Sequence, residues 1–157
     1  MHNYESFSAE RAEQIISRHK DRKGATLPIL HDLQETFGCV PDEAVVMIAE
    51  TLNLSRAEVH GCVTFYHDFR KKVPGRRILK VCRAESCQAA GGNALIARAE
   101  ERLGIGMGET TADGSVTLEP VYCLGLCHSS PAAMLDDKVY AMLDEAKIDA
   151  IVSEADR

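Results

Sequence analysis

Two pairs of cysteines are the residues of this sequence whose type and spacing most directly indicate chemistry. Cys82 and Cys87 stand in the segment CRAESCQAAGG, and Cys123 and Cys127 stand much later in CLGLC. Thiolates in sets of four are the ligands that zinc and iron–sulfur clusters prefer in proteins. The chemistry therefore depends on whether the fold brings both pairs to one place.

The elements predicted around these cysteines bring the pairs to one edge of a sheet. The sequence predicts a strand, a helix and a second strand over residues 77–82, 88–103 and 115–123. A strand–helix–strand crossover is nearly always right-handed and makes its two strands parallel. Cys82 and Cys123 then lie at the same C-terminal edge, and the loops that leave this edge carry Cys87 and Cys127. We expect all four thiols to converge on one site.

The spacings favour a binuclear iron–sulfur cluster over a single zinc ion. Structural zinc sites commonly use tight C-x2-C turns, whereas these pairs are C-x4-C and C-x3-C, with room for one iron on each pair. Gly91 and Gly125 allow backbone N–H groups to approach sulfur, which tunes reduction potential. His128 follows the last cysteine, and we expect it near the cluster or at the surface. The Ser130–Pro131 peptide bond follows in the same loop, and the sequence alone does not determine whether it is cis or trans.

Two other classes of protein stay open at this point. A zinc ion held by the four cysteines would make the chain a zinc-stabilised interaction module. A reactive cysteine pair would make it a thiol–disulfide oxidoreductase, although the sequence lacks the C-x2-C motif typical of that class. Iron content distinguishes the zinc module from an iron–sulfur protein. Reversible reaction of a cysteine pair with dithiol reagents, without bound metal, would identify the oxidoreductase.

A change of pattern divides the chain into two predicted domains. Residues 1–74 are predicted to form a small helical bundle, in which the fourth helix places Val59, Cys62, Val63 and Tyr66 on one face. The segment RKKVPGRR ends it with a helix-breaking Pro-Gly pair. Residues 75–157 then alternate strands and helices in the order β-α-β-β-β-α. The predicted class is α/β, with the bundle first.

Composition excludes several functions. A net charge of −6, 5% aromatic residues and no tryptophan argue against nucleic-acid binding. No stretch is long and apolar enough for membrane insertion, and the first residues lack the layout of a signal peptide, so we expect a cytoplasmic protein. Six cysteines in that compartment are metal ligands or buried thiols. Cys39 and Cys62, outside the two pairs, are assigned to core packing.

Several segments together resemble a known family. CRAESCQAAGG and CLGLCHSSPA, with LPILHDLQETFG and VHGCVTFYHDF before them, resemble the thioredoxin-like [2Fe-2S] subunits of flavin-containing NADH oxidoreductases. These include the 24-kDa-type subunit of respiratory complex I and subunits of NAD-linked hydrogenases and formate dehydrogenases. The first segment is most similar to the gamma subunit of soluble, molybdenum-dependent, NAD-linked formate dehydrogenase. The family's cluster ligands correspond to Cys82, Cys87, Cys123 and Cys127.

The resemblance implies an electron-transfer subunit with one [2Fe-2S] cluster and no catalysis of its own beyond electron transfer. It implies a thioredoxin-like [2Fe-2S] ferredoxin domain and a flavoprotein partner that carries FMN and the NAD site. A further subunit with a molybdenum cofactor would oxidise formate, so that the complex converts formate and NAD+ to CO2 and NADH. The alternatives are the equivalent subunit of complex I or of an NAD-reducing hydrogenase. We assign partner docking to the helical bundle, as a hypothesis.

Overall fold

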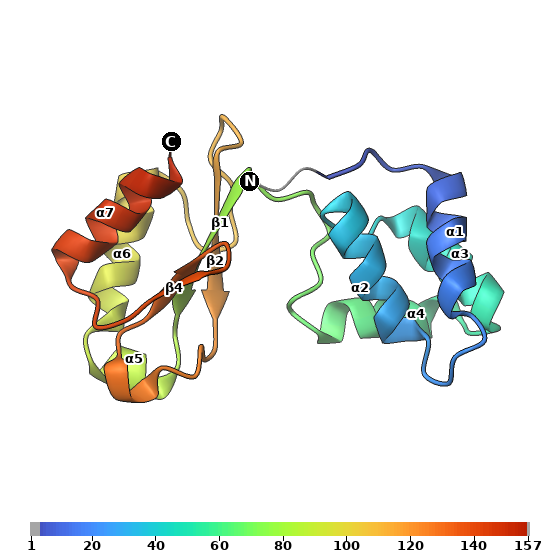
Figure 1. The fold of residues 1–157 in the computed structure, drawn as a ribbon, viewed down its shortest axis with the longest axis horizontal. Helices are drawn as coiled ribbons and strands as arrows, with labels where there is room; N and C mark the ends of the chain where they lie inside the picture. The colour runs from blue at the N-terminus through green and yellow to red at the C-terminus, as the bar shows by residue number, and fades with distance from the viewer. Residues whose placement is uncertain (1–3, 157) are drawn as a thin grey trace. The chain divides into compact units, whose positions relative to one another are not determined.

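The computed structural model describes residues 4–156. These residues divide into two compact units between Val73 and Pro74. Figure 1 shows the first unit as helices alone and the second as a sheet with helices. Within residues 4–156 no helix is both long enough and apolar enough to span a bilayer.

The first unit consists of helices whose ends follow local sequence signals. Ser8 caps the first helix by accepting the Arg11 N–H, and Gly38 ends the second in the left-handed region at φ 78°. Ser55 and Glu58 form a complete capping box at the start of the fourth. The bounds are α1 Ala9–His19, α2 Thr26–Phe37, α3 Asp42–Leu52 and α4 Arg56–Phe65.

Large aliphatic and aromatic side chains fill the core of this unit. The fully buried ones include Ile15, Ile16, Ile29, Leu30, Leu33, Phe37 and Ile48. Val59 and Val63 join them from α4, and Cys62 packs against them half-buried, as predicted. The prediction for Tyr66 is wrong, because the helix ends at Phe65 and the extended backbone of Tyr66 leaves its side chain 44% exposed.

The second unit is a mixed four-stranded sheet in the order β2-β1-β3-β4. β1 pairs parallel with β2, with Cys82 opposite Val121, and the pairings β1–β3 and β3–β4 are antiparallel. This confirms the α/β class and the predicted crossover. The strands are β1 Arg77–Cys82, β2 Val116–Val121, β3 Ala133–Leu135 and β4 Lys138–Tyr140.

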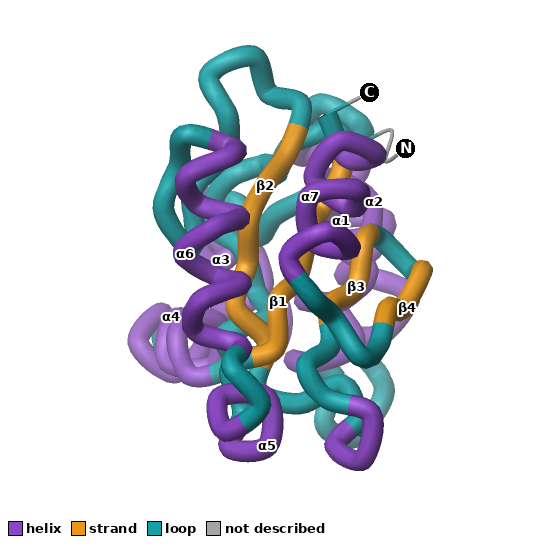
Figure 2. Tube along the Cα trace, turned by 90° about the vertical axis from the view of Figure 1, so that its left-hand side faces the viewer, coloured by secondary structure: helices purple, strands orange, loops and turns teal. Residues whose placement is uncertain are grey.

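The predicted helix over residues 88–103 is in fact two helices. α5 spans Glu85–Ala89 and α6 spans Gly92–Leu103, because Gly91 turns the backbone at φ 89° between them. α6 and α7 (Glu145–Ala155) lie on the same face of the sheet, and Figure 2 shows both in front of the strands. Their buried side chains share one core with Leu79, Leu118 and Leu135 of the strands.

Asp113 makes the second unit sensitive to acid. Its carboxylate accepts hydrogen bonds from the Thr111 hydroxyl and from the N–H and hydroxyl of Ser115, which lower its pKa to about 2. The folded pKa lies below the unfolded value of about 3.9. The resulting stability is therefore present above about pH 4 and is lost as the pH falls through about 2.

We expect Asp113→Asn to lower the thermal unfolding midpoint at pH 7 and to have no such effect below pH 2, measured by circular dichroism. Asp137→Asn is the control, because Asp137 is exposed and its side chain makes no hydrogen bond or ion pair within the described residues. An equal loss at both pH values would contradict the assignment.

Candidate metal centre

The four cysteines of the two pairs lie at the edge where both parallel strands end. Cys82 is the last residue of β1, and Cys87 lies inside the short helix α5, where the sequence predicted a loop. Cys123 follows the end of β2 by two residues, and Cys127 begins the short 3-10 helix η1, Cys127–Ser129. Figure 1 shows α5 and the orange turn of η1 together below the strand ends.

The thiols are arranged as two close pairs. The sulfur atoms of Cys123 and Cys127 lie 3.6 Å apart, and Cys82 and Cys87 lie close enough for the first thiol to raise the pKa of the second. Two sulfurs bound to one tetrahedral metal at about 2.3 Å are about 3.8 Å apart. The spacing of Cys123 and Cys127 therefore suits two ligands of one metal atom.

Electrostatic interactions connect one pair with the other. Burial raises the pKa of the Cys87 thiol, and the neighbouring Cys82 and Cys127 raise it further. The hydrogen bond with Cys123 raises the pKa of the Cys127 thiol. The nearby Cys82 raises the same pKa further. Because metals bind the thiolate, loading of a metal at neutral pH must release protons from these thiols.

Each pair has a different environment. Cys82 and Cys87 are both 3% exposed, and they pack with Ala132 against half-buried neighbours that include Leu124 and Leu126. Cys123 and Cys127 are exposed. Across residues 4–156, no three Cys, His, Asp or Glu side chains gather as the ligand set of one ion. The structure thus places two pairs of thiols at one sheet edge. The convergence of all four thiols around one centre stays a prediction.

The loop between Cys123 and Cys127 is shaped around sulfur. The backbone N–H of Gly125, a residue at φ 76°, donates to the sulfur of Cys123 at 3.3 Å. Cys123 itself has φ 148°, in a region that residues other than glycine rarely adopt. An N–H directed at sulfur stabilises negative charge there, which is the role expected for Gly125.

Gly91 and His128 make no contact with sulfur among the hydrogen bonds of the described residues. The N–H of Gly91 donates to the carbonyl of Gln88, so this glycine serves the turn between α5 and α6 and not a sulfur atom. The next residue is the one under steric constraint, since a Cβ on Gly92 would lie 2.6 Å from the carbonyl oxygen of Cys87. His128 is exposed, with Nδ1 3.1 Å from the hydroxyl of Ser129.

Ser86 is a residue of the site that the sequence patterns did not reveal. Its hydroxyl donates to the carbonyl of Cys127 at 2.7 Å and lies 3.0 Å from the hydroxyl of Ser130. The Ser130–Pro131 bond is cis, and the carbonyl of Ala132 then accepts the N–H of Cys82 at 3.0 Å. These bonds tie the loop of the second pair to the segment that carries the first. The only sequence signal for Ser86 is its place beside Cys87.

Comparison with known proteins identifies the family. The sequence model that describes the thioredoxin-like [2Fe-2S] ferredoxin matches residues 12–156. The chain belongs to this family. Its cofactor is therefore a [2Fe-2S] cluster, and the zinc alternative falls away. The thioredoxin-like domain expected from the sequence is also confirmed.

Similar proteins are subunits of NADH-linked oxidoreductases. The chain is 38% identical to a subunit of the NADH-quinone oxidoreductase of Pseudomonas aeruginosa, over 82% of the chain and 77% of that protein. It is 36% identical to the corresponding NADH-quinone oxidoreductase subunit of Rhizobium meliloti, over 91% of the chain and 85% of that protein. It also resembles a crystal structure of an NAD+-reducing [NiFe]-hydrogenase, with a TM-score of 0.70 and 25% identity. That match covers 87% of this chain but only 24% of the hydrogenase chain.

We expect Ser86→Ala to weaken retention of the cluster, because it removes the hydroxyl that joins the two cysteine loops. Loss of one such bond corresponds to cluster loss that is about twofold to tenfold faster in the presence of a chelator. Visible absorbance over time measures this rate. Ser153→Ala is the matched control, since its hydroxyl donates to a carbonyl within α7 at 2.8 Å. Equal rates in the two variants would argue against the role of Ser86.

Proposed function

We propose that Cys82, Cys87, Cys123 and Cys127 bind one [2Fe-2S] cluster and that the chain transfers electrons to or from a flavoprotein partner. The observation that carries this proposal is the pairing of the thiols at one sheet edge, with 3.6 Å between the exposed sulfurs. Cys82 and Cys87 would bind one iron, and Cys123 and Cys127 the other. When bound, such a cluster supplies one-electron exchange at a potential that its surroundings set.

The residues of the chain give the site a closed side and an open side. The pair Cys82 and Cys87 is buried, so water reaches it poorly. Cys123 and Cys127 are at the surface, and Tyr122 beside them is 66% exposed. An exposed aromatic residue next to exposed ligands offers contact area to another protein. The partner's redox cofactor would therefore approach from the side of Cys123.

The parent assembly is the finer part of this proposal. The resemblance of CRAESCQAAGG supports an NAD-dependent formate dehydrogenase, in which a flavoprotein carries FMN and the NAD site and another subunit carries a molybdenum cofactor. The names of the similar proteins, NADH-quinone oxidoreductase and NAD+-reducing hydrogenase, support the alternative assemblies at least as well. A cytoplasmic location is part of the same proposal, as is a docking role for the helical bundle of residues 1–74.

We expect about two irons per chain after purification without air, and a rhombic spin-half EPR signal that develops only on reduction with dithionite. Cys123→Ser should remove or alter this signal, because it replaces one sulfur ligand. Cys62→Ser is the control, since Cys62 packs half-buried against the core of the helical unit. Zinc in place of iron would refute the electron-carrier function, and an unchanged signal in Cys123→Ser would refute the ligand assignment.

The parent assembly is tested by purifying the complex from the native host through a tag on this chain. We expect NAD+ reduction with formate, and molybdenum in the purified complex. NAD+ reduction with hydrogen would instead assign the chain to a hydrogenase, and NADH oxidation with quinone would assign it to a complex I. The electron-transfer role holds in all three cases, whereas the formate assignment holds only in the first.

A further inference from the structure

Helix α4 is the least buried helix of the first unit. Among its ten residues only Val59 and Val63 are buried, whereas α2 buries Ile29, Leu30, Leu33 and Phe37. Phe65 at its end is 73% exposed, which is unusual for a large aromatic side chain in a folded protein. The other exposed residues along the helix include Arg56, Ala57, His60, Gly61 and Thr64.

Among the described residues, no neighbour of Gly61 requires a glycine at this position. Glycine in the interior of a helix destabilises it relative to alanine. A Cβ placed on Gly61 would meet no atom of the described chain within 4 Å, so the packing around α4 has room for a side chain. The absence of a side chain lets another backbone approach α4 closely at this point, with Phe65 one turn further along the helix.

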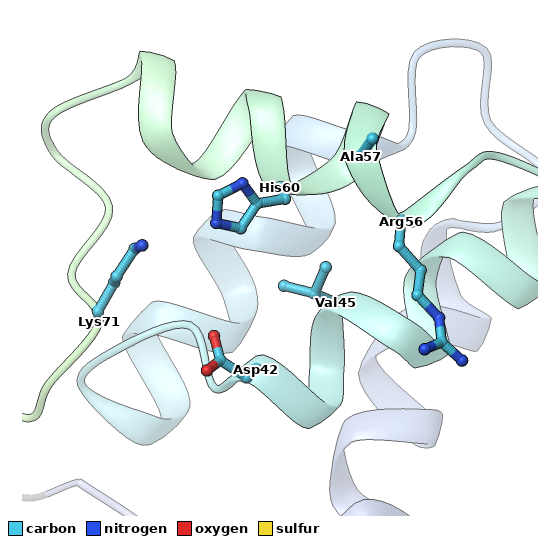
Figure 3. A pocket seen from close by; sticks show the side chains of 6 residues that line it. All are labelled: Asp42, Val45, Arg56, Ala57, His60 and Lys71. Atoms are coloured by element: carbon cyan, nitrogen blue, oxygen red, sulfur yellow. The ribbon is translucent and has the colours of Figure 1, made fainter.

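A pocket of about 490 Å³ opens beside the same helix. Val45 lies at its centre, with His60, Lys71 and Asp42 on one side and Arg56 on the other (Figure 3). In the described part of the chain, the side chains of Asp42, Arg56, His60 and Lys71 make no hydrogen bond or ion pair. The pocket therefore presents two unpaired cations, a histidine and one carboxylate.

We propose that this surface, which we call the α4 face and define as Arg56, His60, Gly61, Phe65 and Lys71, binds an acidic segment of the flavoprotein partner. Carboxylates of the segment would pair with Arg56 and Lys71. The two positive charges of these residues outnumber the one negative charge of Asp42. The carboxylate of Asp42 would accept an N–H of the segment, and an apolar side chain would cover Phe65. The backbone of the segment would pass Gly61. The inference rests on the proposed function, because it takes the partner to be the flavoprotein.

The test measures the affinity of the full, cluster-loaded chain for the flavoprotein subunit by isothermal titration calorimetry. The double variant R56E/K71E should bind at least tenfold more weakly, and its Kd should depend less on salt concentration. A glutamate at position 56 suits the first turn of a helix, so α4 should stay folded. The control K20E/K23E reverses two exposed cations elsewhere in the same unit and should change the Kd less than twofold.

A second variant separates binding from folding. Gly61→Ala should raise the thermal unfolding midpoint, because alanine favours the helix, and should nevertheless weaken binding several-fold. Unchanged affinity in both R56E/K71E and Gly61→Ala, with the EPR signal intact, would overturn the docking proposal and leave the electron-carrier function standing. Wild-type dimers that R56E/K71E abolishes, measured by analytical ultracentrifugation, would assign the α4 face to a second copy and also overturn it. If the wild-type chain carries no cluster and does not bind the flavoprotein, the proposed function fails instead.

Discussion

The parallel pairing of β1 with β2 is the contact on which the cysteine site depends. In this register Cys82 stands opposite Val121, so the two loops that carry the remaining cysteines leave the sheet at the same edge. Leu79 and Leu118, both fully buried, lie on these strands and belong to the core beneath α6 and α7. A slip of one residue would turn such side chains to the other face of the sheet, so packing holds the register. The hydrophobic core thereby determines where the thiols lie.

The strands bring the four cysteines to one edge of the sheet, and hydrogen bonds of the backbone and of small side chains then fix the loops that carry them. The carbonyl of Ala132 holds the end of β1, the hydroxyl of Ser86 holds the carbonyl of Cys127, and Gly125 directs an N–H at the sulfur of Cys123. Three separate segments thus hold the cysteine loops in place. Such preorganisation suits an electron carrier, in which a site that moves little needs little reorganisation when charge changes.

Sequence patterns predicted the features that depend on local interactions. The strands predicted at residues 77–82 and 115–123 follow from residues within a few positions of one another, and so do the caps observed at Ser8, Gly38 and Ser55. The break at Gly91 was missed because AAGG is compatible with a helix start as well as with a turn. Ser86 was missed because its bond to Cys127 joins residues 41 positions apart in sequence. The exposed end of α4 was misjudged at Tyr66, since an apolar residue at helical spacing does not reveal where the helix stops.

The short distance between Cys123 and Cys127 has a consequence for the biogenesis of the protein. Before a cluster is inserted, these two exposed thiols are neighbours, and their sulfurs need to move only about 1.5 Å closer to form a disulfide. The raised pKa of Cys127 slows this oxidation, because the thiolate is the reactive form. In a newly made chain exposed to oxygen, such a disulfide would remove two of the four proposed cluster ligands. If these cysteines are ligands, as we propose, a reducing compartment or delivery of iron and sulfide soon after folding would protect the site.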